Sequence, residues 1–498
     1  MRYLISNGSI IDPTQRVATI GHVLIENGKV TNIIQMTDRL PSGMGDNLEV
    51  IDARGCCVAP GFTDLHVHLR EPGEEHKETI ESGIAAAIRG GFTTICAMPN
   101  TQPPYDTPTV VRQVRQRAQE IGGTQVDVIG ALTVDRAGTT LTEMAALVEA
   151  GCIAFSDDGS PLQDPAMMRN AMAYARMLDV PIMSHCEETR LNHGWAMHEG
   201  VISTRLGLAG YPAAAEEVQI ARDIILAEQI GAHLHICHVS TAGGVELIRR
   251  AKQRGVHVTA EVTPHHLTMT DRWVLGRLGQ PIDPPNGTFS ERVQRRSREE
   301  QLPLPSWLDP RLLDPYDTNT RVSPPLRTEA DIEALLEGLS DNTIDAIATD
   351  HAPHSIIDKS HEYALAACGI SGLETALGLV LTLVHRGAVD LMNVVAKLTE
   401  GPATILKRAP TSLRPGSNAN VVIFDPDRHW VVDTSQLVSK GKNSPLHGQR
   451  LKGQVMLTMI NGTIHFRREG FGNANLHITV PSVSRLGGIL PGDDEDEQ

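Results

Sequence analysis

Two histidines and an arginine share one side of a short apolar segment, GFTDLHVHLREPG. His66, His68 and Arg70 are spaced by two, and side chains alternate between the two faces of a β-strand. The two imidazoles and the guanidinium are therefore expected to point the same way, while Leu65 and the other apolar residues between them pack on the opposite side. Two neutral imidazoles on one face make half of a metal site, and an adjacent arginine suits an anionic ligand. The alternative is an exposed polar edge, but the apolar run favours a buried strand that leads into a loop.

Further candidate metal ligands stand at the ends of other short apolar runs: Asp158, His185, His238 and Asp350. Together with the first two histidines they form a histidine and carboxylate set without a thiolate, which suits catalytic zinc. Zinc lowers the pKa of bound water toward ~7 and polarises a carbonyl oxygen. A carboxylate beside that water can take its proton and return it to a leaving nitrogen. Asp350 is the predicted acid/base residue, and the expected reaction is hydrolysis, or its reverse, at an amide-like carbon.

Alternation along the strands selects among neighbouring candidates. Asp158 shares a face with the small residues before it, which favours it over Asp157. His238 shares a face with Leu234 and Ile236 and lies nearest the end of its run. We therefore prefer His238 as a ligand to the two histidines that precede it, which are expected to pack or form hydrogen bonds elsewhere.

Three further side chains are candidates for holding a substrate. Arg70, Asn100 and His354 follow the ends of three predicted strands, and together they offer a cation and hydrogen-bond donors for a carboxylate and an amide. Arg70 could instead form a structural ion pair with Glu71 or Glu78. Its place on the same face as the two histidines favours substrate binding.

The candidate residues require a scaffold that brings the ends of many strands together. Residues 58–405 contain eight short strand-like runs that alternate with segments of helical length. The predicted strands are 61–70, 92–100, 126–133, 153–158, 180–185, 234–240, 257–265 and 345–354. This pattern is typical of a (β/α)₈ TIM-type barrel, an α/β fold in which catalytic groups lie at the C-terminal ends of the strands. Residues 272–316, rich in Pro, Arg and Gly, are predicted to form an insertion.

Both ends of the chain show the alternation of β-strands. Residues 1–57 contain apolar runs broken by Asn7-Gly8 and Asn27-Gly28, and residues 406–475 contain two more runs, with Asn461-Gly462 at a turn. Asn-Gly between apolar runs is a strong hairpin signal. We predict a small β-sandwich formed by both chain ends. The remaining tail, 476–498, has an acidic end that is expected to be disordered.

Composition excludes several classes of protein. The chain has 498 residues, a formal net charge of −16 and no long basic run, so nucleic acid is not an expected partner. No apolar stretch approaches the ~20 residues that span a membrane. The seven cysteines are odd in number and lack a Cys-x-x-Cys pair, which favours a reducing, cytoplasmic location. Cys186 and Cys237 are expected to face away from the site, so a catalytic cysteine is not favoured.

The motifs together resemble those of the dihydroorotase family of the amidohydrolase superfamily. The similar segments are GFTDLHVHLREPG, FTTICAMPNTQP, FSDDGSPLQD, MSHCEE, HICHVSTAGG, VTPHHL and IATDHAPH. The resemblance extends to the chain ends through VIDARGCCVAPGF, NANVVIFDP and GQVMLTMINGTIHF. The combination is specific, whereas a lone His-x-His would not be.

The resemblance implies metal roles for five of these residues. His66 and His68 correspond to the ligands of the more buried metal, and His185 and His238 to the ligands of a second metal. Asp350 corresponds to an aspartate that binds metal and acts as acid and base. Zinc is therefore the expected cofactor, with one or two ions per subunit.

The resemblance also bears on the substrate. Arg70, Asn100 and His354 correspond to residues that hold it. Asp158 stands where hydantoinases and allantoinases carry a carboxylated lysine. A subgroup of bacterial dihydroorotases also has an aspartate at this place. Two departures affect the finer contacts: Ser323 replaces a frequent asparagine, and the segment 366–370 lacks the usual Pro-x-Gly pattern.

These features predict a zinc-dependent cyclic amide hydrolase that interconverts N-carbamoyl-L-aspartate and L-dihydroorotate in pyrimidine synthesis. One alternative is another enzyme of the same chemistry, an allantoinase or a hydantoinase. A second is a non-catalytic dihydroorotase-like subunit of aspartate transcarbamoylase, which would lack the metal ligands. We expect a small-molecule substrate and a homo-oligomer, with aspartate transcarbamoylase as a candidate partner.

Overall fold

The computed structural model describes residues 1–36, 48–192, 194–279 and 307–472. Two regions named above fall largely or wholly outside these ranges: residues 280–306 of the predicted insertion, and the tail 476–498. Among the described residues, no helix is both long and apolar enough to cross a membrane.

Eight parallel strands form a barrel, which confirms the predicted fold class. In spatial and sequence order they are β6 (Phe62–Val67), β7 (Phe92–Ala97), β8 (Gln125–Ala131), β9 (Cys152–Ser156), β10 (Ile182–Ser184), β13 (Leu234–Ile236), β14 (Val258–Val262) and β15 (Ala346–Ile347). The segment that follows β15 meets β6 through a parallel bridge between His351 and Val67, and the His68 N–H donates to the His351 carbonyl at 2.8 Å. This bridge completes the ring of strands. It places the candidate residues that follow β6 beside those that follow β15.

Helices surround the barrel and bury their apolar faces against it. They are α1 (Ile80–Gly90), α2 (Pro108–Ile121), α3 (Met144–Ala150), α4 (Pro165–Met177), α6 (Ala213–Ile230), α7 (Ala242–Gln253), α10 (Glu329–Ser340), α12 (Ala376–His385), α13 (Leu391–Lys397) and α14 (Glu400–Ile405). In α1, Ile80, Ile84 and Ala87 lie at helical spacing and join the large cluster between strands and helices. Thr79 begins this helix with a capping box.

Shorter helices and strands lie at the end of the barrel that is formed by the C-terminal ends of its strands. They are β11 (Met197–His198), α5 (Val201–Leu206), β12 (Gly210–Tyr211), α8 (Arg272–Leu275) and α11 (Ile356–Lys359). The strands β11 and β12 form a separate two-stranded sheet. These pieces lie in the loops that follow β10, β14 and β15, where a barrel enzyme builds its pocket.

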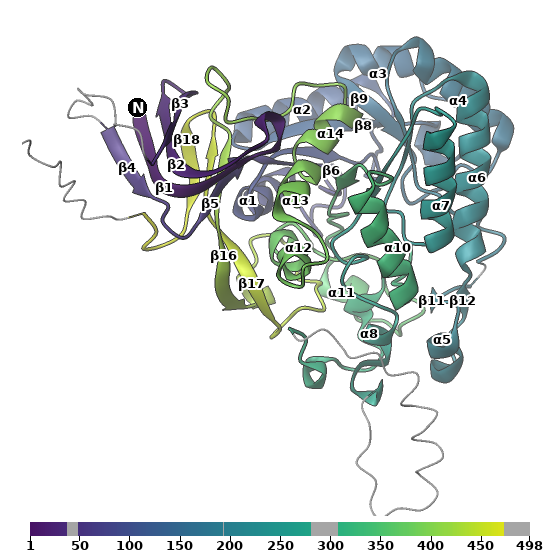
Figure 1. Cartoon of the computed structure of the whole chain (residues 1–498). Helices are drawn as coiled ribbons and strands as arrows, with labels where there is room; N and C mark the ends of the chain where they lie inside the picture. Colours follow the sequence, from purple (N-terminus) through teal and green to yellow (C-terminus); the bar gives the residue numbers. More distant parts are fainter. Residues whose placement is uncertain (37–47, 193, 280–306, 473–498) are drawn as a thin grey trace, which may run out of the picture.

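The two chain ends form one shared β-sheet beside the barrel (Figure 1). Its strands are β1 (Arg2–Asp12), β2 (Val17–Glu26), β3 (Lys29–Gln35), β4 (Leu48–Asp52), β5 (Cys57–Pro60), β16 (Val421–Val431), β17 (Arg450–Ile460) and β18 (Thr463–Arg467). The strand β5 joins the two parts, because it pairs with β1 on one side and with β16 on the other. Apolar residues from both ends form a core of their own, and β17 packs against α12 of the barrel.

Two of the three Asn-Gly pairs form the predicted turns. Asn27-Gly28 joins β2 to β3, and Asn461-Gly462 joins β17 to β18, with positive φ at each of these residues. The prediction for Asn7-Gly8 is wrong. Strand β1 continues through this pair, and its pairing with β2 shifts register between Ile5 and Gly8. The positive φ of Asn7 therefore produces a bulge within one long strand.

Candidate metal centre and substrate pocket

His66 and His68 enter the site from the first barrel strand. His66 lies within β6 and His68 directly follows it, and both are buried. Their expected face is correct, but the expected packing of Leu65 is not. Leu65 belongs to an apolar cluster inside the barrel, while Val67 packs outward in the cluster with the helices. The pairing of β6 with β7 is irregular between Asp64 and Val67, so strict alternation does not hold here.

Asp158 is the common neighbour of all four predicted histidine ligands. Its carboxylate oxygens lie 3.4 Å from His66 Nε2, 3.6 Å from His68 Nε2, 3.4 Å from His185 Nδ1 and 3.3 Å from His238 Nε2. Burial disfavours the charged form, but the imidazoles around it hold the pKa of Asp158 well below its usual range.

The neighbouring aspartate has a different role. The Asp157 carboxylate accepts hydrogen bonds from the N–H groups of Leu132 and Thr133 at 2.9 and 3.1 Å, and from the Thr133 hydroxyl. Its side chain therefore ties the ends of β8 and β9 together instead of entering the site.

His185 and His238 face each other across the pocket, with His185 Nδ1 3.0 Å from His238 Nε2. The alternation used to select His238 does not describe the structure, because Leu234 and Ile236 pack outward against the helices. His238 faces the centre because its φ is +33°. This unusual backbone conformation turns a side chain inward that an extended strand would have directed elsewhere.

Asp350 reaches the centre from the loop after β15. It also has a positive φ, +48°, and its Oδ1 lies 3.0 Å from His68 Nε2 and 3.6 Å from His66 Nε2. Burial favours the neutral acid, but the hydrogen bond from His68 and the charge of His66 outweigh it and lower the pKa of Asp350. The structure thus brings all six predicted ligands into one cluster.

Two glutamates that the sequence analysis did not select support these histidines. Glu261, the residue before the last in β14, bridges His66 Nδ1 at 2.8 Å and His235 Nε2 at 3.1 Å. Glu187 lies 3.0 Å from His185 Nε2. Such partners fix the orientation and tautomer of a ligating histidine. The signal for Glu261 was present, because a glutamate inside the apolar strand VTAEV is buried only when it has a partner.

The cluster fits a metal ion. His66 Nε2 is a buried nitrogen without a hydrogen-bond partner among the described residues, while its Nδ1 is held by Glu261. Two overlapping groups each bring their donor atoms within 4.8 Å of one another: His66 with Asp158 and His238, and His66 with His68 and Asp350. Imidazole nitrogens and carboxylate oxygens without a thiolate are the ligand set of a catalytic zinc site.

The cysteines near the cluster remain thiols. Cys186 packs outward, as expected, but Cys237 lies inside the barrel beside His66, which corrects its expected orientation. Burial raises the pKa of both thiols far above their usual range. A buried neutral thiol is a poor nucleophile, so neither cysteine is suited to act as a catalytic nucleophile.

One cavity of about 360 Å³ collects the candidate residues. Every predicted site residue except His66, which is fully buried, lines it; Glu187, Trp195, Ser323, Cys368 and Gly369 line it as well. The cavity therefore combines the metal cluster with the two segments in which this sequence departs from the family pattern.

The three predicted substrate-binding residues lie in this cavity. Arg70, with φ of +60°, donates through Nε to the Pro353 carbonyl at 3.3 Å and lies beside His354 Nε2 at 3.4 Å. Burial and the adjacent guanidinium lower the pKa of His354 to about 2, so its ring is neutral. The Asn100 carbonyl oxygen lies 2.7 Å from His68 Nδ1, which leaves the Asn100 amide N–H₂ as the group able to face a ligand.

Comparison with solved structures places this architecture among known barrels. L-hydantoinase (dihydropyrimidinase) from Arthrobacter aurescens is similar with a TM-score of 0.75 and 24% identity, covering 94% of this chain and 97% of that chain. A dihydropyrimidinase from Brevibacillus agri has a TM-score of 0.72 and 19% identity, covering 95% and 96%. At these identities the similarity concerns the fold.

Sequence comparison is more specific. Residues 55–243 match the family model described as Dihydro-orotase-like. The chain is 44% identical to a dihydroorotase from Syntrophus aciditrophicus over 94% of this chain and 100% of that protein. It is 45% identical to a dihydroorotase from a Thermoanaerobacter species over 94% and 98%.

The barrel and these relatives define the chain as a cyclic amide hydrolase. Because the identity is high and covers nearly the full length of both proteins, the family is also clear. The chain belongs to the dihydroorotase family.

Proposed function

We propose that the cavity at the ends of the barrel strands is the active site of a zinc-dependent dihydroorotase. The reaction is the reversible cyclisation of N-carbamoyl-L-aspartate to L-dihydroorotate in de novo pyrimidine (UMP) biosynthesis. The observation that carries this proposal is the placement of Arg70 and His354 beside the histidine and aspartate cluster in one cavity of about 360 Å³.

The metal site is proposed to use His66, His68, Asp158, His185, His238 and Asp350. Bound zinc, as one or two ions, would supply Lewis-acid polarisation of the ring carbonyl and favour ionisation of water near neutral pH. Glu261 and Glu187 hold two of the imidazoles in place from behind. This support keeps the ligand nitrogens aimed at the centre before any substrate enters.

Asp350 is proposed as the proton carrier. In the hydrolytic direction water adds to the ring carbonyl carbon and the carbon–nitrogen bond breaks. Asp350 accepts the proton that the water loses and delivers it to the departing ring nitrogen. In the synthetic direction Asp350 removes a proton from the attacking nitrogen and returns it to the hydroxyl group that departs from the protonated carboxyl carbon, which leaves as water.

Substrate orientation is proposed to depend on Arg70, Asn100 and His354. The buried guanidinium of Arg70 is the cation that pairs with the carboxylate of dihydroorotate. The Asn100 N–H₂ group is a donor for a ring carbonyl or the carboxylate. Neutral His354 keeps Nδ1 without a hydrogen-bond partner among the described residues, so this nitrogen is available to the ligand.

Zinc content and turnover of the Asp350→Ala variant test the acid/base assignment. We expect kcat to fall by about 10²–10⁴-fold, because alanine removes the carboxylate that accepts and returns the proton. Asp427→Ala, at an exposed position of β16, is the matched control and should keep wild-type turnover. Near-normal activity of Asp350→Ala at wild-type zinc content would contradict the assignment.

Turnover of dihydroorotate, hydantoin and allantoin by the same preparation tests the substrate. The hydantoinase fold is shared, but a plain hydantoin lacks the carboxylate that Arg70 would bind. We expect dihydroorotate to be opened fastest; faster opening of hydantoin would favour the alternative enzyme class.

The assembly and location of the protein remain predictions. We propose a homo-oligomer, with aspartate transcarbamoylase as a candidate partner, and light scattering with and without that enzyme measures both. All seven cysteines are unpaired, which supports the proposed cytoplasmic location.

A further inference from the structure

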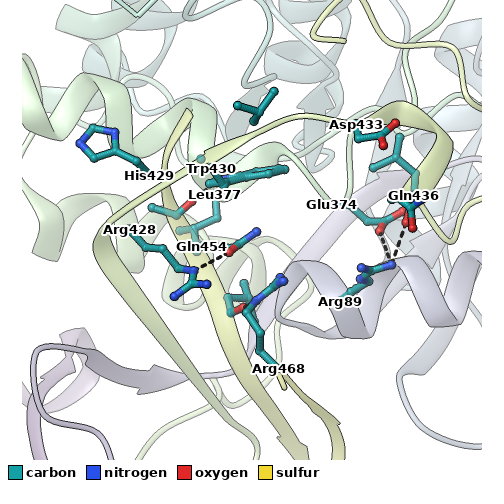
Figure 2. A pocket seen from close by; sticks show the side chains of 15 residues that line it. Arg89, Glu374, Leu377, Arg428, His429, Trp430, Asp433, Gln436, Gln454 and Arg468 are labelled. Atoms are coloured by element: carbon teal, nitrogen blue, oxygen red, sulfur yellow. Dashed lines mark hydrogen bonds and ion pairs between the residues drawn. The ribbon is translucent and has the colours of Figure 1, made fainter. Parts of the chain in front are cut away.

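A second cavity lies where barrel helices α1 and α12 meet strands β16 and β17 of the terminal sheet (Figure 2). Its volume is about 390 Å³, within the range of small-molecule sites. Its walls come from α1, the start of α12, strands β16 and β17, and the segment that follows β16. It shares no lining residue with the cavity that holds the metal cluster.

Three arginines converge on this cavity from different elements. Arg89 comes from α1, Arg428 from β16, and Arg468 directly follows β18. Burial lowers the pKa of Arg468, and the positive charges of Arg89 and Arg428 lower it further. Like charges held this close oppose one another, and a bound anion would relieve that repulsion.

Two of the arginines, Arg428 and Arg468, retain hydrogen-bond donors for a ligand, whereas Arg89 donates to the Gln436 carbonyl at 2.9 Å and lies 3.7 Å from Glu374. Arg428 donates through Nε to Gln454 at 3.0 Å, and Arg468 donates through Nε to the Val455 carbonyl at 3.2 Å. Neither arginine forms an ion pair with a carboxylate among the described residues. Their terminal NH₂ groups are therefore available in the forked geometry that recognises phosphate. The Arg468 guanidinium also lies over the Phe466 ring, at 5.5 Å, which restricts its orientation.

The two carboxylates that line the cavity are occupied by other groups. Glu374 accepts from the N–H groups of Val438 and Ser439 at 2.8 and 3.2 Å, and Arg89 lies 3.7 Å from it. Asp433 accepts from the N–H and hydroxyl of Ser435. These carboxylates hold the segments that line the cavity. They do not neutralise the positive charges of Arg428 and Arg468.

An aromatic wall completes the cavity. Trp430 lies on β16 two residues from Arg428, and its indole N–H donates to the Gly453 carbonyl at 2.9 Å, which holds the ring in place. Among the described residues no other ring or guanidinium stacks on it. A partly exposed indole beside a cluster of arginines suits a ligand that has both a flat ring and a phosphate group.

We propose that this cavity is a binding site for a nucleotide, with its phosphates held by Arg428 and Arg468 and its base against Trp430. The site is independent of the proposed catalytic reaction, because it uses different residues in a separate cavity.

Calorimetric titration of the zinc-loaded full chain with ADP tests the proposal. N-carbamoyl-L-aspartate is present throughout to fill the catalytic pocket. We expect saturable binding of ADP that weakens as salt rises, with adenosine and inorganic pyrophosphate each binding at least tenfold more weakly. The double variant Arg428→Met/Arg468→Met should lose at least tenfold in affinity while its dihydroorotate turnover is unchanged. Trp430→Leu should weaken ADP more than pyrophosphate.

Matched controls separate a specific site from general attraction to positive charge. Arg169→Met, at an exposed position of α4, should leave ADP affinity unchanged. Should the double variant fail to fold, the exposed single variant Arg428→Glu carries the same expectation of a tenfold loss. The proposal is overturned by the absence of saturable ADP binding at millimolar concentration, by variants that bind ADP as tightly as the wild type, or by pyrophosphate that binds as tightly as ADP.

Discussion

Three residues of the site adopt a backbone conformation that non-glycine residues rarely use. Arg70, His238 and Asp350 all have positive φ values, and each stands where a barrel strand ends. Such conformations cost on the order of 1–3 kcal/mol each and persist only where the surroundings enforce them. Here they turn side chains toward one centre immediately after the regular hydrogen bonding stops. If these three residues were replaced by others of similar size, we would expect the backbone to keep its turns, while the groups that bind the metal or the substrate would be lost.

Glu261 offers a test of how the metal site is supported. Glu261→Gln keeps the shape of the side chain but removes the charge that His66 and His235 share. We expect zinc affinity to fall by about 10–100-fold, the usual effect of losing a partner behind a metal ligand, and chelator competition measures it. Glu333→Gln, at an exposed position of α10, is the control. Unchanged zinc affinity in Glu261→Gln would show that His66 is oriented without this carboxylate.

The sequence was sufficient to predict the cluster residues but not their support. A strand end is visible in sequence, so His185 and Asp350 could be chosen from their place at a strand end, and alternation along the strand then favoured Asp158 over Asp157. Glu261 belongs to a strand whose own end carries no predicted ligand, and its contact with His66 crosses 195 residues. The turn at His238 was also invisible, because its positive φ depends on the loop that follows and not on the alternation before it.

The segment between β16 and β17 holds the substrate side of the pocket. Asn443 accepts from the His354 N–H at 2.8 Å and donates to the carbonyls of Ala352 and Gly369 at 3.0 and 2.9 Å. It is buried and also bonds to Ser371. One side chain thus joins the loop after β15 to the loop before α12, and both loops line the cavity.

Asn443→Ala should change substrate binding more than metal binding. The loops that carry His354 and Gly369 lose their shared hydrogen bonds, while the zinc ligands keep theirs. We expect KM for dihydroorotate to rise by about tenfold or more, with zinc content unchanged. Asn393→Ala, which removes a single hydrogen bond from α13 to the Leu339 carbonyl, is the control and should leave KM unchanged. A variant with normal KM would contradict the role of Asn443.

The entrance to α8 provides a pH test of stability. Burial, reinforced by the charge of Glu329, raises the pKa of Asp271 to about 7, whereas an unfolded aspartate ionises near ~3.9. The folded state therefore binds more protons between these values, and this group reduces stability as pH rises from about 4 to 7. Asp271→Asn should be more stable than wild type at pH 8, on the order of 4 kcal/mol, with a smaller difference at pH 5. Urea unfolding at both pH values measures this, and an equal difference at the two would contradict it.

Whether a segment forms a helix or a strand could be predicted where its sequence pattern extends over many consecutive residues. Helices such as α1 and α4 carry caps and apolar faces that the sequence displays, and the alternation of strand and helix gave the barrel. The Asn7-Gly8 pair shows the limit. Its sequence is that of a hairpin turn, but pairing of β1 with both β2 and β4 favours one long bulged strand. Tertiary pairing therefore decides between turn and bulge.

The whole molecule depends on pairing between distant parts of the chain. Strand β5 lies between β1 and β16 in the terminal sheet, and the barrel closes between Val67 and His351. Among the described residues, the proposed metal ligands take part in this pairing through their backbone, as in the bond from the His68 N–H to the His351 carbonyl, and not through their side chains. The scaffold should therefore be stable without the ion.

Removal of zinc should abolish turnover but keep the fold. After chelation and dialysis we expect an unchanged far-ultraviolet circular dichroism spectrum and a lower Tm, since an ion that binds only the folded chain stabilises by about 4 kcal/mol at a thousand times its Kd. Zinc, but not magnesium, should restore activity and Tm. Full activity of the metal-free protein would refute the proposed mechanism.

The bridge that closes the barrel also determines when the enzyme can become active during its synthesis. His66 and His68 leave the ribosome early, but Asp350 is separated from His68 by 282 residues. Strand β5 likewise needs β16, which begins at Val421. A nascent chain therefore lacks the last proposed metal ligand until Asp350 is made and carries an unpaired sheet edge until β16 is made, and such edges are prone to association. The order of the strands therefore sets how long the nascent chain needs chaperones. We expect this need to be greatest before the last barrel strand has been synthesised.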